Sequence, residues 1–442
     1  MGRKKDISRR EFLGGATGTI LGATGFPYFI PSSALGRNGR AAPSERVVMG
    51  LIGHGSRGSG HLSGLVNMSE VQLVGVSDLF AARRQSAEER VARLSAEVRG
   101  KAERCETYKD FREMLARKDI EAVVIATPEH WHGLTMIAAV KAGKDVYGEK
   151  SLTLTVAEGQ ALCREVRRYG SVFQVGMQQR SSRNFRFACE LVRNGYLGRL
   201  HTVRVSVPGG YEVANSPAID VPAGFDYDMW LGPAPFKPYN AVRCTSPYGW
   251  YHIYDYCRGW IQAWGVHYID TALWGVPRLQ TMPLEVEGTA VFPRDGLGDT
   301  SLSWDINFTT ADGLRLVFTD TGYHEPNDGN CRFEGDKGWV HVNRSGIWAE
   351  PQSLLEVKIK ANEEHLYESN DHLSNFVECV RSRREPAARV EAGHAATVLG
   401  IAADIASRVG RKLRWDWGSE SFVNDEQANR MLNRTMRSPW RL

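Results

Sequence analysis

The first part of the chain alternates between short apolar runs and longer segments with a helical pattern of apolar residues. The apolar runs predict strands at residues 47–52, 71–77, 122–127, 145–148 and 172–176. The segments between them predict helices at 60–68, 81–98, 110–116, 130–142 and 156–169. Strands that alternate with helices form a parallel, doubly wound sheet, so we expect an α/β N-terminal Rossmann domain.

The pattern changes after residue 176. Apolar and polar positions alternate at 200–207, 284–292, 300–309, 314–320, 331–334 and 339–342, and helical patterns return at 370–383 and 391–409. Alternation of this kind predicts strands with one solvent-facing side. An α+β domain with a mostly antiparallel sheet is therefore expected to follow the Rossmann domain. The Pro-, Tyr- and Trp-rich region 209–259 is a long irregular stretch, which is typical of a functional loop.

These patterns divide the chain into three expected parts. Residues 1–42 form a leader and linker, residues 43–176 the nucleotide-binding domain, and residues 177–442 the substrate and oligomerisation domain. About 400 residues remain without the leader, enough for two domains with full cores. We expect that the C-terminal segment can return to the Rossmann domain and pack against it.

The leader carries a twin-arginine export motif, Ser8-Arg9-Arg10-Glu11-Phe12-Leu13. A weakly apolar Gly- and Ala-rich segment follows, and Ser32-Ser33-Ala34 offers small residues for cleavage. The glycine-broken core does not fit a transmembrane helix. The leader thus predicts a periplasmic or secreted protein that uses the twin-arginine (Tat) machinery, which exports folded proteins. The alternative is a chance Arg-Arg pair in a disordered tail.

Charge and cysteine content narrow the function classes. The net charge is +4, but residues 1–42 hold seven Lys and Arg against Asp6 and Glu11, so the remainder is near −1. This balance removes the case for binding nucleic acid or an anionic membrane. The seven cysteines show no metal-site spacing and are expected to be mostly buried thiols, and no metal site is expected.

A glycine loop follows the first predicted strand and reads Gly53-His54-Gly55-Ser56-Arg57-Gly58. Gly53 permits a sharp turn, Gly55 a close approach of a pyrophosphate, and Gly58 close packing of the helix on its strand. Asp78 comes 20 residues after the last glycine and suits a ribose diol, which favours NAD over NADP. The alternative is a tight glycine turn with no ligand.

Two further strand ends carry possible chemistry, because ligands bind at the carboxyl ends of such strands. Thr127, Pro128 and His132 follow one strand and are expected near the cofactor, whereas helix capping and packing is the preferred role of His130. Glu149-Lys150 ends the next strand. A lysine there can exchange a proton with a substrate hydroxyl. The alternative is an ordinary solvated lysine.

The substrate side is expected in the second domain. His267 and Asp270 share a helix face, so Asp270 either orients His267 toward a substrate or pairs with it to fix the helix. Aromatic side chains before this helix suit the apolar faces of a sugar, with Gln178 and Arg180 as polar partners. These aromatics are Trp250, Tyr251, Tyr254, Tyr256 and Trp260, of which Trp260 is the first choice. Alternatively, they fill the gap between the domains.

Together these segments resemble the Gfo/Idh/MocA oxidoreductases over nearly the whole mature chain. The resemblance rests on the glycine loop, Ala126-Thr127-Pro128, Ala142-Gly143-Lys144, Gly148-Glu149-Lys150 and the His267 helix. Residues 176–181, 230–235 and 436–440 are similar to the twin-arginine-exported branch.

The resemblance implies a nicotinamide enzyme that acts on sugars or polyols, with Lys150 as the acid/base residue and His267 as the helix histidine. Two positions depart from the family pattern. Ser151 replaces a proline, and Ala263 replaces an aspartate four residues before the histidine.

The leading interpretation is an exported oxidoreductase that acts on a hydroxyl of a sugar, glycoside or polyol. Because free NAD is scarce outside the cytoplasm, the cofactor is expected to stay tightly bound and to be recycled in place. One alternative is a redox-neutral NAD-dependent glycosidase that works by oxidation, elimination and reduction. Another is a catalytically weakened sugar-binding protein. The expected partners are the substrate, the export machinery and further copies of the chain.

Overall fold

The computed structural model describes residues 45–245, 248–320 and 329–442. The predicted leader and its export motif lie outside the described residues. Residues 47–442 form one structural unit.

The first sheet has six parallel strands in the order β3-β2-β1-β4-β5-β6. This confirms the expected doubly wound domain. The sequence pattern did not reveal β3, because it has only three residues and none of them is buried. The strands are β1 (Val47–Ile52), β2 (Val71–Ser77), β3 (Glu106–Tyr108), β4 (Ala122–Ile125), β5 (Asp145–Gly148) and β6 (Phe173–Val175).

Five helices connect these strands, close to the expected positions. The helix α2 begins four residues earlier than expected, because Gly58 and Gly60 obscure the apolar pattern of its first turns. The helix α6 starts with a capping box in which Thr155 and Glu158 bind each other's backbone N–H groups. The helices are α2 (Ser56–Asn67), α3 (Ala81–Arg99), α4 (Phe111–Leu115), α5 (Glu129–Lys141) and α6 (Val156–Tyr169).

The second sheet has nine strands in the order β13-β12-β11-β7-β10-β9-β8-β14-β15. Among the described strands of this second sheet, only β7 and β10 pair in parallel, which confirms a mostly antiparallel sheet. The strands are β7 (Leu200–Ser206), β8 (Leu284–Val291), β9 (Ser303–Thr310), β10 (Arg315–Thr319), β11 (Asn330–Gly335), β12 (Gly338–Val342), β13 (Ile347–Glu350), β14 (Leu413–Asp416) and β15 (Ser421–Phe422).

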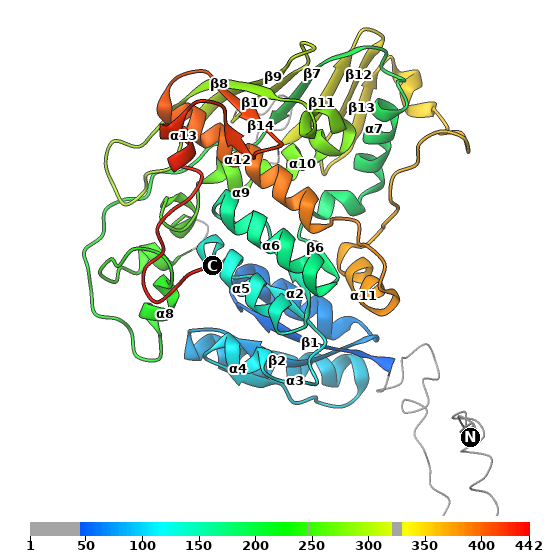
Figure 1. Cartoon of the computed structure of the whole chain (residues 1–442). Coiled ribbons are helices and arrows are strands. Elements are labelled where there is room, and N and C mark those ends of the chain that lie inside the picture. Colours follow the sequence, from blue (N-terminus) through cyan, green and yellow to red (C-terminus); the bar gives the residue numbers. More distant parts are fainter. Residues whose placement is uncertain (1–44, 246–247, 321–328) are drawn as a thin grey trace, which may run out of the picture. The chain divides into compact units, whose positions relative to one another are not determined.

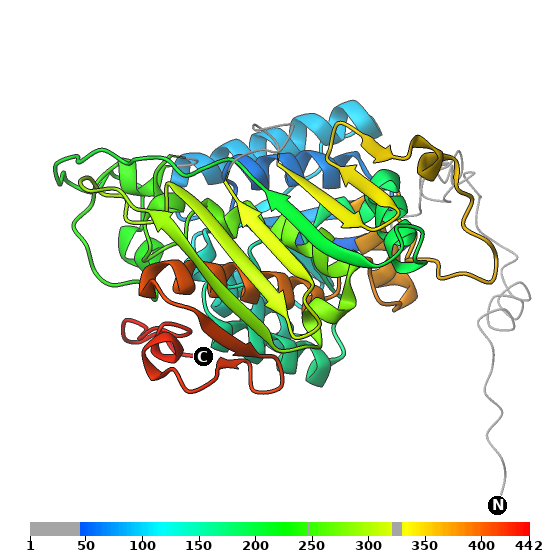
Figure 2. The ribbon, with the colours of Figure 1, turned by 90° about the horizontal axis from the view of Figure 1, so that it is seen from above.

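Two helices, α10 (Gly265–Gly275) and α12 (Val390–Val409), separate this sheet from the Rossmann domain (Figure 1). Nearly every residue of α12 is buried, since its many Ala and Gly residues let it pack closely against α6, α10 and β8. Figure 2 looks onto the opposite face of the sheet, where no helix of the described ranges covers the strands. One face of the sheet therefore supports the core between the domains.

The segment between β7 and α10 contains only short helices. These are α8 (Tyr227–Leu231), η4 (Val242–Cys244), η5 (Trp250–His252) and α9 (Trp260–Ala263). Trp264 separates α9 from α10, so the aromatic residues before His267 do not continue its helix. The remaining helices are η3 (Gln178–Ser181), α7 (Arg183–Arg193), η6 (Pro277–Gln280), η7 (Gln352–Glu356), α11 (His372–Ser382) and α13 (Glu426–Arg430).

The end of the chain contacts the Rossmann helices. The Leu432 carbonyl accepts a hydrogen bond from the Val156 N–H at 3.1 Å, and the Trp440 ring packs edge-on against Trp131 with centroids 4.7 Å apart. All seven cysteines are free, and all but Cys163 are buried, as expected. Within the described ranges no helix is long and apolar enough to cross a membrane.

Candidate active site

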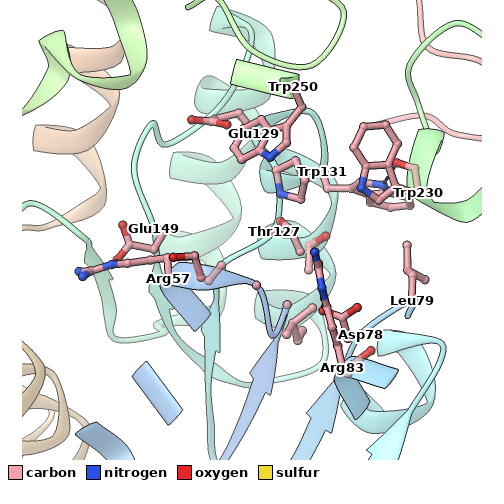
Figure 3. Close-up of a pocket in the computed structure, with 18 of the residues that line it drawn as sticks. Arg57, Asp78, Leu79, Arg83, Thr127, Glu129, Trp131, Glu149, Trp230 and Trp250 are labelled. Atoms are coloured by element: carbon pink, nitrogen blue, oxygen red, sulfur yellow. Dashed lines mark hydrogen bonds and ion pairs between the residues drawn. The ribbon is translucent and has the colours of Figure 1, made fainter. Parts of the chain in front are cut away.

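A cavity of about 580 Å³ opens at the carboxyl ends of β1, β2, β4 and β5. Its other wall comes from the region between α8 and α10, which contributes several indole rings. Figure 3 shows the two charged pairs that flank it, Arg57 with Glu149 on one side and Asp78 with Arg83 on the other. The cavity therefore lies where a doubly wound sheet binds its ligand.

The glycine loop is shaped by two close backbone contacts. Gly53 has a φ of +91°, and a Cβ on it would lie 2.6 Å from the Ala126 carbonyl oxygen. A Cβ on Gly58 would lie 1.9 Å from the Gly53 carbonyl oxygen. Gly53 and Gly58 are thus required by the turn and by the packing of α2 against it.

Close packing does not explain why residue 55 is a glycine. A Cβ there would meet only the Arg83 guanidinium, at 3.8 Å. The packing of the protein therefore does not demand glycine at this position. Gly55 and Ser56 line the cavity at the N-terminus of α2, where free N–H groups favour an anion. The space left by Gly55 fits the close approach of a pyrophosphate.

Asp78 is held by the backbone at the end of β2. Its two carboxylate oxygens accept hydrogen bonds from the N–H groups of His54 (2.8 Å) and Phe80 (2.9 Å). The carboxylate still lines the cavity and has further lone pairs for a ribose diol. The His54 side chain is buried and does not line the cavity, so this residue contributes through its backbone. Asp78 and the glycine loop together fit a bound dinucleotide.

Glu149 links the glycine loop to the strand end at β5. Its Oε1 lies 2.7 Å from both Arg57 Nε and His61 Nε2, and 3.3 Å from Gln178 Nε2. Burial opposes the charged form, but the His61 hydrogen bond and the Arg57 charge keep the pKa of Glu149 well below its usual range. Arg57 and Glu149 line the cavity as an ion pair, and the amide of Gln178, which also lines the cavity, donates a hydrogen bond to Glu149.

His132 was expected to contact the cofactor, but it does not line the cavity. Its ring nitrogens lie 2.6 Å from the Ser151 carbonyl oxygen (Nδ1) and 2.8 Å from the Thr127 carbonyl oxygen (Nε2). His132 is buried and connects the loop after β4 to the loop after β5. It therefore positions Thr127 and Pro128, which do line the cavity, rather than reaching the ligand itself.

Lys150 and His267 both line the cavity. The Lys150 ammonium donates to the Ala263 carbonyl oxygen at 2.8 Å and lies 5.7 Å from the Tyr251 ring centroid. Burial and then the Lys150 charge lower the pKa of His267 well below its usual value. His267 is therefore a neutral imidazole beside a lysine.

Asp270 does not orient His267. Both of its oxygens accept hydrogen bonds from the Arg180 guanidinium at 2.8 Å, and the Nδ1 of His267 has no hydrogen-bond partner among the described residues. Neither Arg180 nor Asp270 lines the cavity. This nearly buried ion pair fixes η3 to α10, which corrects the expectation that the two residues contact substrate.

The aromatic residues that line the cavity also differ from those expected. Tyr256 is fully buried, with its ring centroid 4.9 Å from that of Trp230. Trp260 packs on Tyr211 (4.7 Å) and Trp264 (5.4 Å) outside the cavity. The aromatic residues of this region that do line the cavity are Trp230, Trp250, Tyr251 and Trp264.

Glu129 was not predicted as a site residue, but it lines the cavity with a residue exposure of only 1%. Its position directly after the Thr127-Pro128 strand end was the available signal. Lys109 and Arg344 also line the cavity and come from segments without a recognisable motif. Among the described residues, no group of His, Cys, Asp and Glu side chains is arranged to hold a metal ion.

Two family models match this chain. Residues 47–177 match the NAD-binding Rossmann fold of the oxidoreductase family, and residues 184–442 match its C-terminal alpha/beta domain. The chain belongs to the Gfo/Idh/MocA oxidoreductase family. Its Rossmann domain is accordingly an NAD-binding domain, in agreement with the geometry of the glycine loop and Asp78.

Relatives of this Gfo/Idh/MocA protein include dehydrogenases and a glycosidase. The myo-inositol 2-dehydrogenase of Thermotoga maritima is 28% identical over 158 residues, 36% of this chain and 44% of the relative. An alpha-N-acetylgalactosaminidase of Shewanella oneidensis is 34% identical over 133 residues, 29% of this chain and 28% of the relative. The chain thus matches less than half the length of either relative.

Solved structures share the fold over a longer span. The WlbA dehydrogenase of Bordetella pertussis, in complex with NADH and UDP-GlcNAcA, superimposes with a TM-score of 0.60. The match covers 83% of this chain and 98% of that one at 17% identity. The chain therefore shares its fold with that dehydrogenase over most of both chains.

Proposed function

We propose that the protein is an NAD-dependent oxidoreductase that acts on a hydroxyl group of a sugar, glycoside or polyol. The observation that carries the proposal is the position of Lys150 in the same cavity as the glycine loop and Asp78. A proton-exchanging group and a dinucleotide site that share one cavity suit the oxidation of an alcohol. The similarity to a myo-inositol 2-dehydrogenase supports a sugar or polyol as the substrate class.

Each group of residues has a separate role in the proposed reaction. The glycine loop and Asp78 would hold NAD, which when bound would supply the hydride acceptor. The hydrogen bond to the Ala263 carbonyl orients Lys150, whose neutral amine form accepts the proton of the substrate hydroxyl. The neutral His267 can hydrogen-bond to the same hydroxyl, and the indole rings exclude water from the cavity.

The proposal includes export through the twin-arginine pathway and a cofactor that stays bound. Export is supported by the Ser8–Leu13 motif and by the segments similar to the twin-arginine-exported branch of the family. A protein folded before export carries its cofactor with it, and free NAD is scarce outside the cytoplasm. The cofactor must then be reoxidised in place, by a second substrate or an electron acceptor.

This proposal predicts that the protein purified from the exported fraction releases NAD on denaturation, without added cofactor. We expect NAD rather than NADP, because the carboxylate of Asp78 binds a ribose diol and repels a 2′-phosphate. Mass spectrometry of the released nucleotide measures the outcome. Predominant NADP, or a protein that is empty and works only with added NAD, would contradict the proposal.

A second candidate function is a redox-neutral glycosidase, which the similarity to an alpha-N-acetylgalactosaminidase favours. In that reaction the hydride returns to the same sugar after loss of the aglycone. The two functions separate in one experiment. NADH absorbance that persists after addition of a sugar indicates an oxidoreductase, whereas release of the aglycone without lasting absorbance indicates the glycosidase.

The aromatic wall gives a paired prediction. Trp250→Ala is expected to raise KM for the sugar about tenfold, because an aromatic contact contributes about 0.5–1.5 kcal/mol beyond the buried area. Trp260→Ala is expected mainly to lower the melting temperature, since large buried aromatics cost about 3–5 kcal/mol when truncated. Steady-state kinetics and thermal melts with bound NAD measure both. A KM that rises in Trp260→Ala but not in Trp250→Ala would contradict this prediction, because it would show that Trp260 contacts the substrate and Trp250 does not.

A further inference from the structure

Two segments near the ends of the second domain, 230–235 and 436–440, take no part in the reaction described above, but they contact each other in the fold. The Arg437 N–H donates to the Pro233 carbonyl oxygen at 2.9 Å, and the Arg437 Nε donates to the Gly232 carbonyl oxygen at 3.0 Å. Figure 1 shows the C-terminal trace, in red, passing beside α8. The C-terminal segment is therefore attached to the end of α8.

The Arg437 guanidinium also binds the body of α8. Its Nη2 donates to the Asp228 carbonyl oxygen at 2.8 Å, and its Nη1 pairs with the Asp228 carboxylate at 2.5 Å. The Asp228 side chain is 77% exposed, so water screens this ion pair and the hydrogen bonds to carbonyl groups matter more. A planar guanidinium can bind several acceptors at once, and a cation suits the C-terminal end of a helix.

Aromatic residues connect this contact to the cavity. Trp440 packs against Trp131, whose Nε1 donates to the Trp230 carbonyl oxygen at 3.0 Å. Gly232 lies so close to Trp131 that a Cβ on it would be 2.2 Å from the ring atom Cζ2. Trp131 and Trp230 line the cavity, whereas Arg437 and Trp440 do not. The C-terminal segment therefore supports this part of the cavity wall from behind.

The other end of α8 is attached to the residues that follow β2. Phe225 forms an antiparallel bridge with Phe80, and their rings stack with centroids 3.8 Å apart. The Asp226 carboxylate, which caps α8, pairs with Lys109 Nζ at 2.7 Å. Phe80 and Lys109 both line the cavity. Residues 224–232, the α8 segment, are thus fixed at one end to the Rossmann domain and at the other to the C-terminal segment.

The α8 segment lies on the side of the cavity that fits the adenosine half of NAD. Asp78 suits the ribose of that half. Figure 3 shows Trp230 on the side of Asp78, away from Glu149. Met229 and Trp230 are the residues of the α8 segment that line the cavity. A movement of this segment would therefore open that side of the cavity.

We propose that Arg437 and Trp440 are positioning residues that hold the α8 segment closed over the adenosine half of NAD. This inference rests on the proposed function, in which the cofactor stays bound through turnover. NAD leaves when the α8 segment moves away, and that movement breaks its contacts with the C-terminal segment. Because neither residue lines the cavity, both act through Trp131 and the α8 segment.

The first test separates closure from binding strength. Since Arg437 does not line the cavity, its loss should favour opening equally with and without NAD, which speeds entry and release together. Arg437→Ala should therefore release NAD about tenfold faster, the effect of about 1.4 kcal/mol, with a Kd within about threefold of wild type. Exchange of the bound cofactor against isotopically labelled NAD measures release from the holoenzyme, and equilibrium dialysis measures Kd.

Arg441→Ala is the matched control, because Arg441 is an exposed arginine of the same segment, and it should release NAD at the wild-type rate. Trp440→Leu keeps an apolar side chain but removes the ring contact with Trp131, so it should also speed release. This variant decides the question if Arg437→Ala fails to fold. A wild-type release rate in either folded variant, or a Kd that weakens in proportion to the faster release, would overturn the proposal.

The second test follows the α8 segment itself and needs no turnover. The Trp230 and Gly232 N–H groups donate to the Asp226 and Asp228 carbonyl oxygens, so their hydrogen–deuterium exchange reports opening. This exchange should be faster in Arg437→Ala, with no change in α2, and equal exchange in the two proteins would refute the inference. By contrast, a wild-type protein that binds no NAD would refute the proposed function, and the amide exchange would still decide whether the C-terminal segment holds the α8 segment.

Discussion

Replacing Lys150 with alanine is expected to abolish most turnover while the protein keeps its bound NAD. General acid/base groups contribute about 10²–10⁴-fold to rate, and Lys150 is the proton-exchanging group of the proposed reaction. The groups that fit the dinucleotide, the glycine loop and Asp78, belong to the ends of β1 and β2, so the substitution leaves them in place. The loss should therefore appear in kcat and not in cofactor content.

The measurement is single-turnover reduction of the bound cofactor by a sugar substrate, followed by absorbance. Lys141→Ala is the matched control, because Lys141 is an exposed lysine on the helix α5 that borders the same cavity. A Lys150→Ala protein that retains more than about a tenth of the wild-type rate would place the proton transfer on another group. His267→Ala should also reduce the rate, by a smaller factor, since a neutral imidazole without a carboxylate partner contributes one hydrogen bond.

Gly58→Ala is expected to weaken NAD binding about 10- to 100-fold and to lower the melting temperature. The new Cβ would lie 1.9 Å from the Gly53 carbonyl oxygen, so α2 and the glycine loop must move apart. Overpacking of this kind costs about 1–3 kcal/mol, occasionally more, and each 1.4 kcal/mol is about tenfold in affinity. The N-terminus of α2, which would hold the pyrophosphate, moves with the loop.

The control for this variant lies two residues further along the same helix. Gly60→Ala introduces the same methyl group where nothing lies within 4 Å, and alanine is the better helix former. Gly60→Ala should therefore keep its NAD and melt at or above the wild-type temperature. Equal cofactor loss in the two variants, measured by calorimetric titration of the stripped protein, would show that the close contact at Gly58 is not what shapes the site.

The local pattern of apolar and polar residues was sufficient to predict most helices and strands of the fold. The strands β1, β2 and β5 and the helix α6 have the predicted bounds, because strands buried in the sheet appear as short apolar-rich segments and a helix buries one apolar stripe. The short strands β13, β14 and β15 were not predicted. Each has two to four residues, which is too short for a period to be visible.

The glycine loop and its acid could also be read from sequence, because the chemistry there depends on a short stretch of backbone. Gly53, Gly58 and Asp78 act through turn geometry and hydrogen bonds to neighbouring N–H groups. Residue type and spacing determine such contacts directly. The same holds for Lys150, since the end of a parallel strand points to the ligand edge of the sheet.

Only the tertiary structure decided which side chains of the second domain face the cavity. Asp270 pairs with Arg180, 90 positions away, rather than with His267 on its own helix. Trp250 faces the cavity and Trp260 does not, because the chain turns between η5 and α9. The sequence shows that this region is rich in aromatic residues. The direction in which each aromatic side chain points depends on packing against distant elements.

Glu129 shows the same division most clearly. Its sequence position predicts a helix start at a strand end, and a carboxylate is ordinary in the first turn of a helix. Its side chain is nevertheless only 1% exposed and lines the cavity together with Trp250 and Tyr251, which lie more than one hundred positions away in the sequence. Sequence by itself thus determined the fold class, the dinucleotide loop and the lysine at the strand end. The burial of Glu129, the pairing of Asp270 with Arg180 and the identity of the aromatic residues that line the cavity depend on long-range contacts, which only the folded chain creates.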